Sequence, residues 1–306
     1  MPIADIYRRQ VTLLLRVLPY VAEEDCFALK GGTAINLFFR DMPRLSVDID
    51  LTYLPVRPRQ QSLAEIDAAM RRIATRIQNG IPGARVASDR TEGAVTRLVV
   101  RGDNAQIKIE VTPVLRGSVY APELRAVMPA VEKTFGFAET SIVSFADLFA
   151  GKIVAALDRQ HPRDLFDVLG LFTHEGITED LRRAFLVYLI SHNRPMAEVL
   201  APTRKDISEE FLRGFAGMTD RPVTLGELLA ARERLIAEIV GGMPLPHRRF
   251  LMSFERGEAD WSLLGIPGVE QLPAVRWRQQ NLDSLSPGRR AALVEHLSTV
   301  LGISEF

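Results

Sequence analysis

Hydrophobic and polar positions alternate strictly in the ten residues from Arg44 to Tyr53. In this stretch, RLSVDIDLTY, apolar residues occupy the odd positions and polar residues occupy the even ones. Strict alternation is the period of a β-strand, so the pattern predicts a strand with one apolar face. The opposite face carries Asp48 and Asp50, which lie ~7 Å apart on a strand. Two carboxylates at this spacing repel each other, and aspartate disfavours strands, so the pair requires a chemical explanation.

The same reading predicts a mixture of helices and strands in the first part of the chain. Helical spacing covers residues 4–20 and 60–79, and another helix starts just after a pair of glycines, Gly31 and Gly32. Strand-like runs cover residues 27–29, 83–90, 94–103 and 105–114. The last two runs are separated by Gly102-Asp103-Asn104, which predicts a hairpin turn.

Beyond about residue 120 the pattern becomes mostly helical. Ser144 and Asp147 have the spacing of a capping box and predict a helix start, and His161-Pro162 ends this helix and begins the next. Further helices are expected in 178–241, and a last one near 287–301. The sequence therefore predicts an α+β fold, with a mixed sheet flanked by helices in residues 1–120 and a mostly helical domain in residues 121–306.

Composition and charge exclude several classes of protein. Lysine plus arginine and aspartate plus glutamate both number 38, so bulk charge does not indicate a strongly basic nucleic-acid binder. The single cysteine excludes an internal disulfide and, with only five histidines, argues against a structural zinc site. We find no segment with the length of a membrane span and no signal-peptide pattern, so a cytoplasmic protein without membrane contact is expected.

A local basic patch is still compatible with zero net charge. Arginines recur in the carboxy-terminal region and could contact RNA, although a solvated surface is the commoner role of such residues. They are Arg248, Arg249, Arg276, Arg278, Arg289 and Arg290. Trp261 and Trp277 lie among them, and their apolar neighbours predict core packing.

The sequence KGGTA contains the elements of a phosphate-binding turn. Gly31 and Gly32 permit close approach of the backbone, and Thr33 can cap the following helix. Amide groups at a helix start bind phosphate oxygens. The alternative is a tight strand-to-helix turn that binds no ligand.

A third carboxylate can join the aspartate pair. In AQIKIEV, Glu110 lies on the polar side of an alternating run. If this strand lies beside the aspartate strand, three carboxylates share one face, an arrangement that a cation such as Mg²⁺ would stabilise. The alternative is a solvated sheet face.

Taken together, these motifs resemble the AbiEii abortive-infection toxins, a family within the DNA polymerase β-like nucleotidyltransferase superfamily. The resemblance rests on KGGTAINLF, on R-x-S-x-D-I-D-L at 44–51 and on K-I-V-A-A-L-D-R…P-R-D-L-F-D at 152–167. FLMSFERGEADWSLLGIPG and LPAVRW extend it over most of the chain. Fourteen residues separate Thr33 from Asp48, more than in the minimal superfamily motif. This spacing argues against a polymerase-like or CCA-adding enzyme.

The resemblance implies a role for each matching residue. Residues 1–120 would form the nucleotidyltransferase domain, and residues 121–306 would contribute Lys152 and Asp164 to its cleft. Lys152 would reach the triphosphate, and Asp164 would orient Lys152 or the acceptor hydroxyl. Alternatively, Lys152 extends from an apolar helix to solvent and Asp164 complements a helix dipole. The implied nucleotide-binding residues are Gly31, Gly32, Thr33, Arg44, Ser46 and Lys152. The implied ligands of Mg²⁺, or of Mn²⁺, are Asp48, Asp50 and Glu110, and with Lys152 and Asp164 these acids form the implied catalytic set.

The resemblance also implies a biological function. The chain would be the toxin of a toxin–antitoxin system that acts in phage defence by abortive infection. It would transfer NMP from an NTP to an RNA acceptor, the tRNA 3′ end, and thereby block translation. An antitoxin from a neighbouring gene would be its partner. One alternative is transfer to a small-molecule or protein hydroxyl, and a second is a nucleotide-binding regulator without turnover.

Overall fold

The computed structural model describes residues 5–303, which divide into two compact units. The first unit runs to Ser144 and also includes the segment Gly217–Pro222. The second unit comprises Phe145–Ala216 and the chain from Val223 onward. The first unit thus extends past residue 120, where the change in sequence pattern placed the boundary. The reason is that two strands beyond that point, β6 (Glu123–Ala126) and β7 (Glu139–Ile142), join the same sheet.

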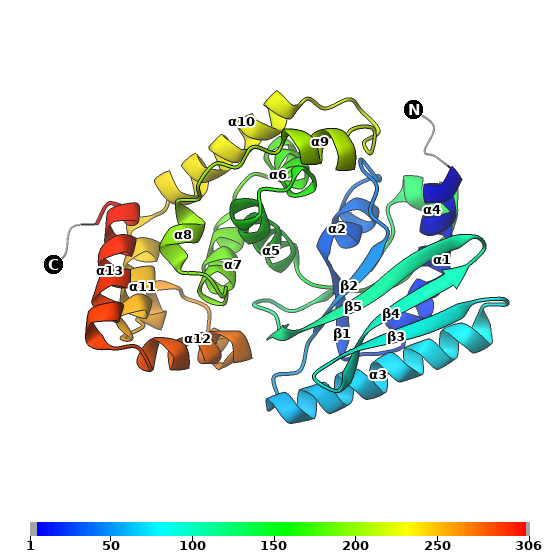
Figure 1. Cartoon of the computed structure of the whole chain (residues 1–306), viewed down its shortest axis with the longest axis horizontal. Helices are drawn as coiled ribbons and strands as arrows, with labels where there is room; N and C mark the ends of the chain where they lie inside the picture. Colours follow the sequence, from blue (N-terminus) through cyan, green and yellow to red (C-terminus); the bar gives the residue numbers. More distant parts are fainter. Residues whose placement is uncertain (1–4, 304–306) are drawn as a thin grey trace. The chain divides into compact units, whose positions relative to one another are not determined.

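A seven-stranded mixed sheet forms the frame of the first unit (Figure 1). Its strand order is β3-β4-β5-β2-β1-β7-β6. Strand β2 lies in the middle, parallel to β5 on one side and antiparallel to β1 on the other. The α+β fold expected from the sequence is confirmed. The other strands are β1 (Phe27–Lys30), β2 (Asp48–Tyr53), β3 (Arg85–Thr91), β4 (Ala94–Gly102) and β5 (Ala105–Arg116).

One face of this sheet is apolar and is covered by two long helices. Helices α1 (Asp5–Ala22) and α3 (Arg59–Gly80) contact each other and the strands. Strand positions such as Leu98 and Ile109 are fully buried, as are apolar residues along both helices. Because strand side chains alternate between the two faces, burial of this set leaves the intervening polar residues on the opposite face.

The predicted hairpin between β4 and β5 is confirmed. Gly102 pairs with Ala105, so only Asp103 and Asn104 form the turn. Both have positive φ, 51° and 56°, as a two-residue turn of the type I′ class requires. Aspartate and asparagine tolerate this conformation better than other residues with side chains. The turn thereby fixes the register of β4 against β5.

Two local predictions need correction. Strand β2 begins at Asp48 rather than at Arg44, because Arg44 forms only an isolated bridge with Thr219. The predicted helix after the glycines begins at Gly31 itself. It is the single turn α2 (Gly31–Ala34), which continues as a π-helix over Ile35–Phe39. The alternating pattern and the two glycines therefore predict that β2 and α2 exist, but they do not predict the residue at which each begins.

All elements of the second unit are helical in the part of the chain that the structure describes. Helix α5 contacts α6, α7, α8 and α10 and is buried along most of its length. Helix α6 starts as predicted, with Pro162 in its first turn and His161 accepting a hydrogen bond from the Arg163 amide. The helices are α5 (Phe145–Asp158), α6 (Pro162–His174), α7 (Glu179–Ile190), α8 (Met196–Leu200), α9 (Ser208–Gly214), α10 (Leu225–Ile236), α11 (Leu245–Arg256), α12 (Pro273–Asp283) and α13 (Pro287–Leu301).

Several shorter helical elements remain, among them the 3-10 helices Trp261–Leu263 and Val269–Gln271 of the second unit. A short helix in the first unit, α4 (Pro129–Phe135), precedes β7, and α10 continues as a π-helix over Ala237–Gly241. Within residues 5–303, none of the helices combines the length and apolar character needed to cross a bilayer.

The hairpin turn gives a first testable prediction. Replacing Asn104 by valine should lower the free energy of unfolding by about 1–2 kcal/mol, because a β-branched residue is strained at positive φ. Replacing Asn104 by glycine should leave stability equal or slightly higher. Urea unfolding of both variants measures the difference. Equal stability of the valine and glycine variants would contradict the assigned turn.

Candidate active site

The two aspartates of β2 share the polar face of the sheet with charged side chains from neighbouring strands. Asp50 is the register partner of Glu110 on β5 and of Lys30 on β1, and Asp48 is opposite Lys108. Partners in register point to the same face of a sheet. The expectation that Glu110 lies beside the aspartate strand is therefore confirmed. These side chains are all partly exposed.

Opposite charges alternate along most of this cross-strand row. Arg97 of β4 is the register partner of Glu110, and its Nε lies 2.7 Å from Glu110 Oε1. Asp89 of β3 follows, with Oδ2 3.8 Å from Arg97 Nη1. At the other end of the row, burial lowers the pKa of Lys30, and the carboxylate of Asp50 opposes that shift. The adjacent carboxylates of Asp50 and Glu110 are thus flanked on both sides by cations.

The donor chemistry of the acidic pair fits a hard divalent cation. Carboxylate oxygens are the ligands that Mg²⁺ and Mn²⁺ prefer, and Mg²⁺ completes its shell with water and substrate phosphates. Within residues 5–303, however, no three side chains of His, Cys, Asp or Glu are arranged to hold a metal. Glu110 instead forms its ion pair with Arg97. Asp48 and Asp50 therefore stand as a two-carboxylate donor set.

The glycine turn packs directly against these acids. Gly31 has φ +76°, and a Cβ atom placed there would lie 2.5 Å from Asp50 Oδ2. A Cβ at Gly32 would lie 2.6 Å from Arg44 Nη2 and 2.8 Å from Ser46 Oγ. Gly31 is favoured by its positive φ and by the nearness of Asp50, whereas a Cβ atom at Gly32 would have to displace the side chains of Arg44 and Ser46. The turn thus brings backbone groups of KGGTA next to the aspartate pair.

Thr33 connects the turn to β2 rather than capping a helix. Its hydroxyl donates to the carbonyl of Asp48 at 2.5 Å and lies 3.1 Å from Ser46 Oγ. The side chain is fully buried and makes no cap, so the predicted capping role is wrong. Residue 33 is the third residue of the short helix, so its amide still belongs to the first turn although its side chain caps nothing. The hydroxyl therefore fixes the position of the first aspartate of β2.

Arg44 and Ser46 lie before β2 and not on its polar face. Arg44 is 3% exposed, and its Nη1 donates to the carbonyl of Leu45 at 2.9 Å. Ser46 lies beside the glycine turn through its contact with Thr33. Both residues therefore border the turn, as their predicted nucleotide-binding role requires, but they reach it from a loop.

In the second unit, Lys152 lies in a buried cluster of charges. Its Nζ lies 2.7 Å from Asp164 Oδ1 and 3.0 Å from Asp167 Oδ2. Asp164 also accepts from Nε of Arg159 at 2.5 Å. Lys152 is 8% exposed, so it does not extend into solvent from an apolar helix. The contact with Asp164 agrees with the expected orienting role of that acid.

The electrostatics of this cluster favour ionised acids. Burial alone would raise the pKa of Asp164, but the charges of Lys152 and Arg159 outweigh burial and hold it well below its usual value. Asp167, the last residue of the 152–167 motif, has no role among the predictions from the sequence. The spacing of Asp164 and Asp167 could have indicated that both acids meet the same partner, because residues three apart lie on one face of a helix. Lys30 was missed because its relation to Asp50 depends on strand register.

Four of the six carboxy-terminal arginines form contacts inside their own unit. Arg248 donates to the carbonyls of Met243 and Leu301, at 2.8 Å and 2.6 Å. Arg278 is buried with Glu255, their closest atoms 3.9 Å apart. Arg276 bonds to the side chain of Gln271. These contacts do not support the expected basic patch for RNA.

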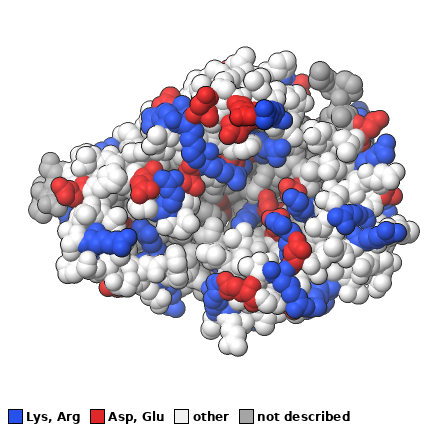
Figure 2. All heavy atoms as spheres, in the orientation of Figure 1, with Lys and Arg blue, Asp and Glu red and all other residues white. Residues whose placement is uncertain are grey.

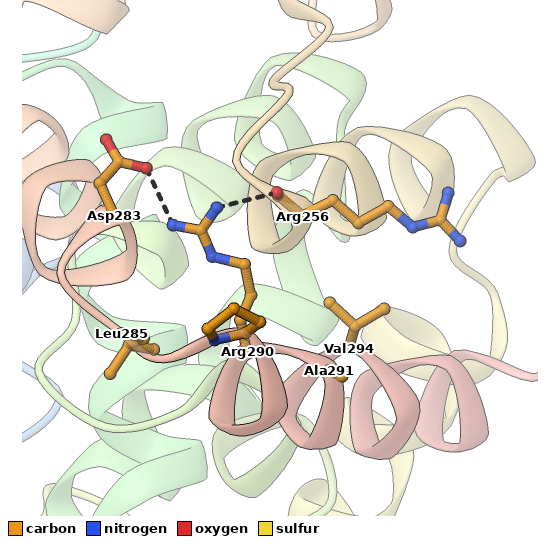
Figure 3. A pocket seen from close by; sticks show the side chains of 7 residues that line it. Arg256, Asp283, Leu285, Arg290, Ala291 and Val294 are labelled. Atoms are coloured by element: carbon orange, nitrogen blue, oxygen red, sulfur yellow. Dashed lines mark hydrogen bonds and ion pairs between the residues drawn. The ribbon is translucent and has the colours of Figure 1, made fainter.

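Arg290 lines a cavity of about 470 Å³ in this unit. Figure 3 shows its guanidinium directed at Asp283 and at the carbonyl of Arg256, at 2.9 Å and 3.2 Å, while the Arg256 side chain extends away. None of the residues predicted to be catalytic lines this cavity, whose walls are Arg256, Asp283, Leu285, Pro287, Arg290, Ala291 and Val294.

The two tryptophans of this region differ in environment. Trp261 packs against Phe250 and Phe254, with ring centroids 5.4 Å and 6.1 Å away, but it is partly exposed and so lies at the edge of the core. Trp277 is 48% exposed, so the prediction of core packing is wrong for this residue.

Comparison of the chain with protein-family profiles shows the family to which it belongs. The profile described as "Nucleotidyl transferase AbiEii toxin, Type IV TA system" matches residues 12–281, which cover both units. The chain belongs to the AbiEii nucleotidyltransferase toxin family. It is therefore a nucleotidyltransferase, and the toxin of a type IV toxin–antitoxin system. The resemblance deduced from the sequence motifs is confirmed.

A solved structure confirms the fold of this AbiEii family member. MenT4, a nucleotidyltransferase toxin from Mycobacterium tuberculosis H37Rv, superposes with a TM-score of 0.60 and 17% sequence identity. The match covers 92% of this chain and 95% of that one. At this identity the likeness shows the fold alone. Among curated proteins, no sequence matches.

Substitution of Gly31 tests the close approach of the turn to Asp50. We expect Gly31→Ala to weaken NTP binding, because the methyl group would displace the Asp50 carboxylate. Gly83→Ala is a matched control, since Gly83 has φ +77° but nothing within 4 Å of its added Cβ. Both variants should lose about 1 kcal/mol of stability from backbone strain, measured by urea unfolding. Equal NTP affinity of the two variants, measured with a fluorescent NTP, would contradict the assigned contact.

The charge cluster on α5 and α6 gives a pH-dependent prediction. Lys152→Met should lower the free energy of unfolding by about 3 kcal/mol at pH 7, because it leaves buried acids without their ammonium partner. The lowered pKa of Asp164 stabilises the wild type above the unfolded pKa of about 3.9, and this contribution is lost as the pH falls through the folded pKa. The deficit of the variant should therefore persist from pH 7 down to about pH 4 and shrink only toward pH 2.

Chemical unfolding of both proteins at pH 7, pH 4 and pH 2 measures this change. Lys133→Met, which removes an exposed lysine from α4, serves as the control and should show little effect at any of these pH values. A deficit for Lys152→Met that is the same at pH 7 and pH 2 would be incompatible with the described ion pairs.

Proposed function

We propose that this AbiEii toxin transfers an NMP group from an NTP to the 3′ end of a tRNA and thereby arrests translation. The observation that carries the proposal is the packing of a glycine turn against two carboxylates on the central strand. Gly31 leaves no room for a Cβ atom beside the Asp50 carboxylate, and Thr33 holds the backbone of Asp48. A nucleotidyltransferase requires phosphate recognition next to acidic groups, and this arrangement supports both.

Asp48 and Asp50 are the proposed ligands of Mg²⁺ or Mn²⁺. A divalent ion bound there supplies charge stabilisation to the phosphate oxygens. The two acids share one strand face, so both carboxylates are available to a single ion. Neighbouring Lys30 and Lys108 reduce the repulsion between the acids while no cation is bound.

The glycine turn and Lys152 are the proposed phosphate-binding groups. Gly31, Gly32 and Thr33 offer backbone amides, and Arg44 borders the turn with a permanent positive charge. Lys152 donates two of its three ammonium hydrogens to Asp164 and Asp167. The third hydrogen is the proposed donor to the triphosphate, where positive charge assists the departure of pyrophosphate.

The proposed reaction is a single displacement at phosphorus. The oxygen of the acceptor 3′-hydroxyl attacks the α-phosphorus of the NTP. The bond from this phosphorus to the bridging oxygen breaks, and pyrophosphate leaves with the electron pair. Glu110 is the proposed acceptor of the hydroxyl proton, since its carboxylate is adjacent to Asp50 and partly exposed. Arg97 holds this carboxylate in position.

The proposal includes the cellular setting. A type IV system pairs the toxin with an antitoxin, and we propose that a neighbouring gene encodes this partner. The substrates NTP and tRNA place the reaction in the cytoplasm. Arrest of translation after infection would serve phage defence.

Incubation with each labelled NTP in turn and total RNA tests this function. The wild type should transfer label to tRNA, and Asp48→Asn should reduce the rate by about 100-fold or more. Asp89→Asn, which removes an exposed carboxylate from the same sheet face, is the control and should retain activity. Label in protein or in a small molecule instead of RNA, or full activity of Asp48→Asn, would overturn the proposal.

A further inference from the structure

The polar face of the sheet becomes purely basic with distance from the aspartates. The row that contains Asp50 carries charges of both signs, because Asp89, Arg97, Glu110 and Lys30 are in register with it across five strands. The next row toward the β4–β5 hairpin holds Ala87, Val99, Lys108 and Asp48. The row after that holds Arg85, Arg101 and Gln106.

The last row places two arginines directly opposite each other. Arg85 on β3 and Arg101 on β4 are register partners, and like charges in this position destabilise a sheet. Arg101 donates to the Gln106 side chain at 2.8 Å, which leaves its charge uncompensated. Within residues 5–303, neither arginine forms an ion pair, and neither does Lys108. By contrast, Arg97 contacts two carboxylates.

These basic side chains are accessible. Arg85 and Arg101 are exposed and Lys108 is partly exposed. On the face drawn in Figure 2, basic side chains gather over the strands of the first unit. Successive rows are ~7 Å apart along a strand, so the arginine row lies ~13 Å from the row of Asp50 and Glu110. The basic surface therefore begins beside Asp48 and leads away from the acids.

We infer that Arg85, Arg101 and Lys108 form a surface that binds the phosphate backbone of the acceptor RNA upstream of its 3′ end. The inference rests on the proposed function, in which that 3′ end reacts at the aspartates. A polyanion supplies the negative charge that the opposed arginines lack. Single-stranded nucleic acid is bound in this way along a basic track, without base recognition. The sheet face would then set the direction in which the strand approaches.

Removal of the two arginines tests the surface. We compare the full-length wild type with the double variant Arg85→Gln/Arg101→Gln. The matched control is Arg213→Gln/Arg289→Gln, which removes the same charge from exposed positions on α9 and α13. Binding of a short fluorescent single-stranded RNA is measured over a series of salt concentrations. Binding of a fluorescent NTP and the unfolding midpoint are measured for all three proteins.

The arginine variant should bind the RNA about tenfold more weakly at low salt, and the slope of log K against log salt should be shallower by about 1.4. Its NTP affinity and unfolding midpoint should match those of the control. Unchanged RNA affinity and slope, or an equal loss in the control, would overturn the inferred surface while leaving the nucleotidyltransferase intact. Absence of RNA binding by the wild type would instead contradict the RNA acceptor and this surface together, and transfer of label to a non-RNA acceptor would identify that failure.

Discussion

The candidate site depends on the register of three adjacent strands. Because β2 pairs with β5 on one side and β1 on the other, Asp50 lies between Glu110 and Lys30. A shift of one residue in β2 would turn both aspartates toward the apolar face under α1 and α3. The buried side chains of Ile49 and Leu51 oppose such a shift, since they would then be exposed. The hydrophobic core thus holds the acids at the polar face, where their mutual repulsion would otherwise favour separation.

The glycine turn adds possible phosphate-binding groups next to the acids that the strand register positions. Gly31 follows β1 directly, so the pairing of β1 with β2 also determines how the turn meets Asp50. The Thr33 hydroxyl adds a second connection, to the backbone of Asp48. The acids, the turn and the flanking cations are therefore positioned by one set of strand pairings, and none of them depends on a flexible loop alone. The cluster of Lys152, Asp164 and Asp167 is also built from few elements. The two successive helices α5 and α6 supply all three groups.

Much of the fold and part of the site could be predicted from the sequence. Alternation and helical spacing locate the strands and long helices, because burial acts on local periodicity. The adjacency of Glu110 and Asp50 was also inferred from such patterns. The start of β2, the contact of Thr33 with Asp48 and the row from Asp89 to Lys30 could not be predicted, because each depends on pairing between distant segments. The predicted basic patch near the carboxy terminus was not supported for the same reason. Arg248 and Arg290 donate to backbone carbonyl groups of distant segments, and no sequence pattern reveals these contacts.

The central claim is that Asp48 and Asp50 hold a divalent cation together with an NTP. Titration with Mn²⁺ in the presence of NTP, followed by electron paramagnetic resonance of the free ion, tests it most directly. Wild-type protein and the Asp89→Asn control should bind Mn²⁺ with equal affinity, whereas Asp48→Asn and Asp50→Asn should bind it at least about tenfold more weakly. Equal Mn²⁺ affinity of all four proteins would contradict the account.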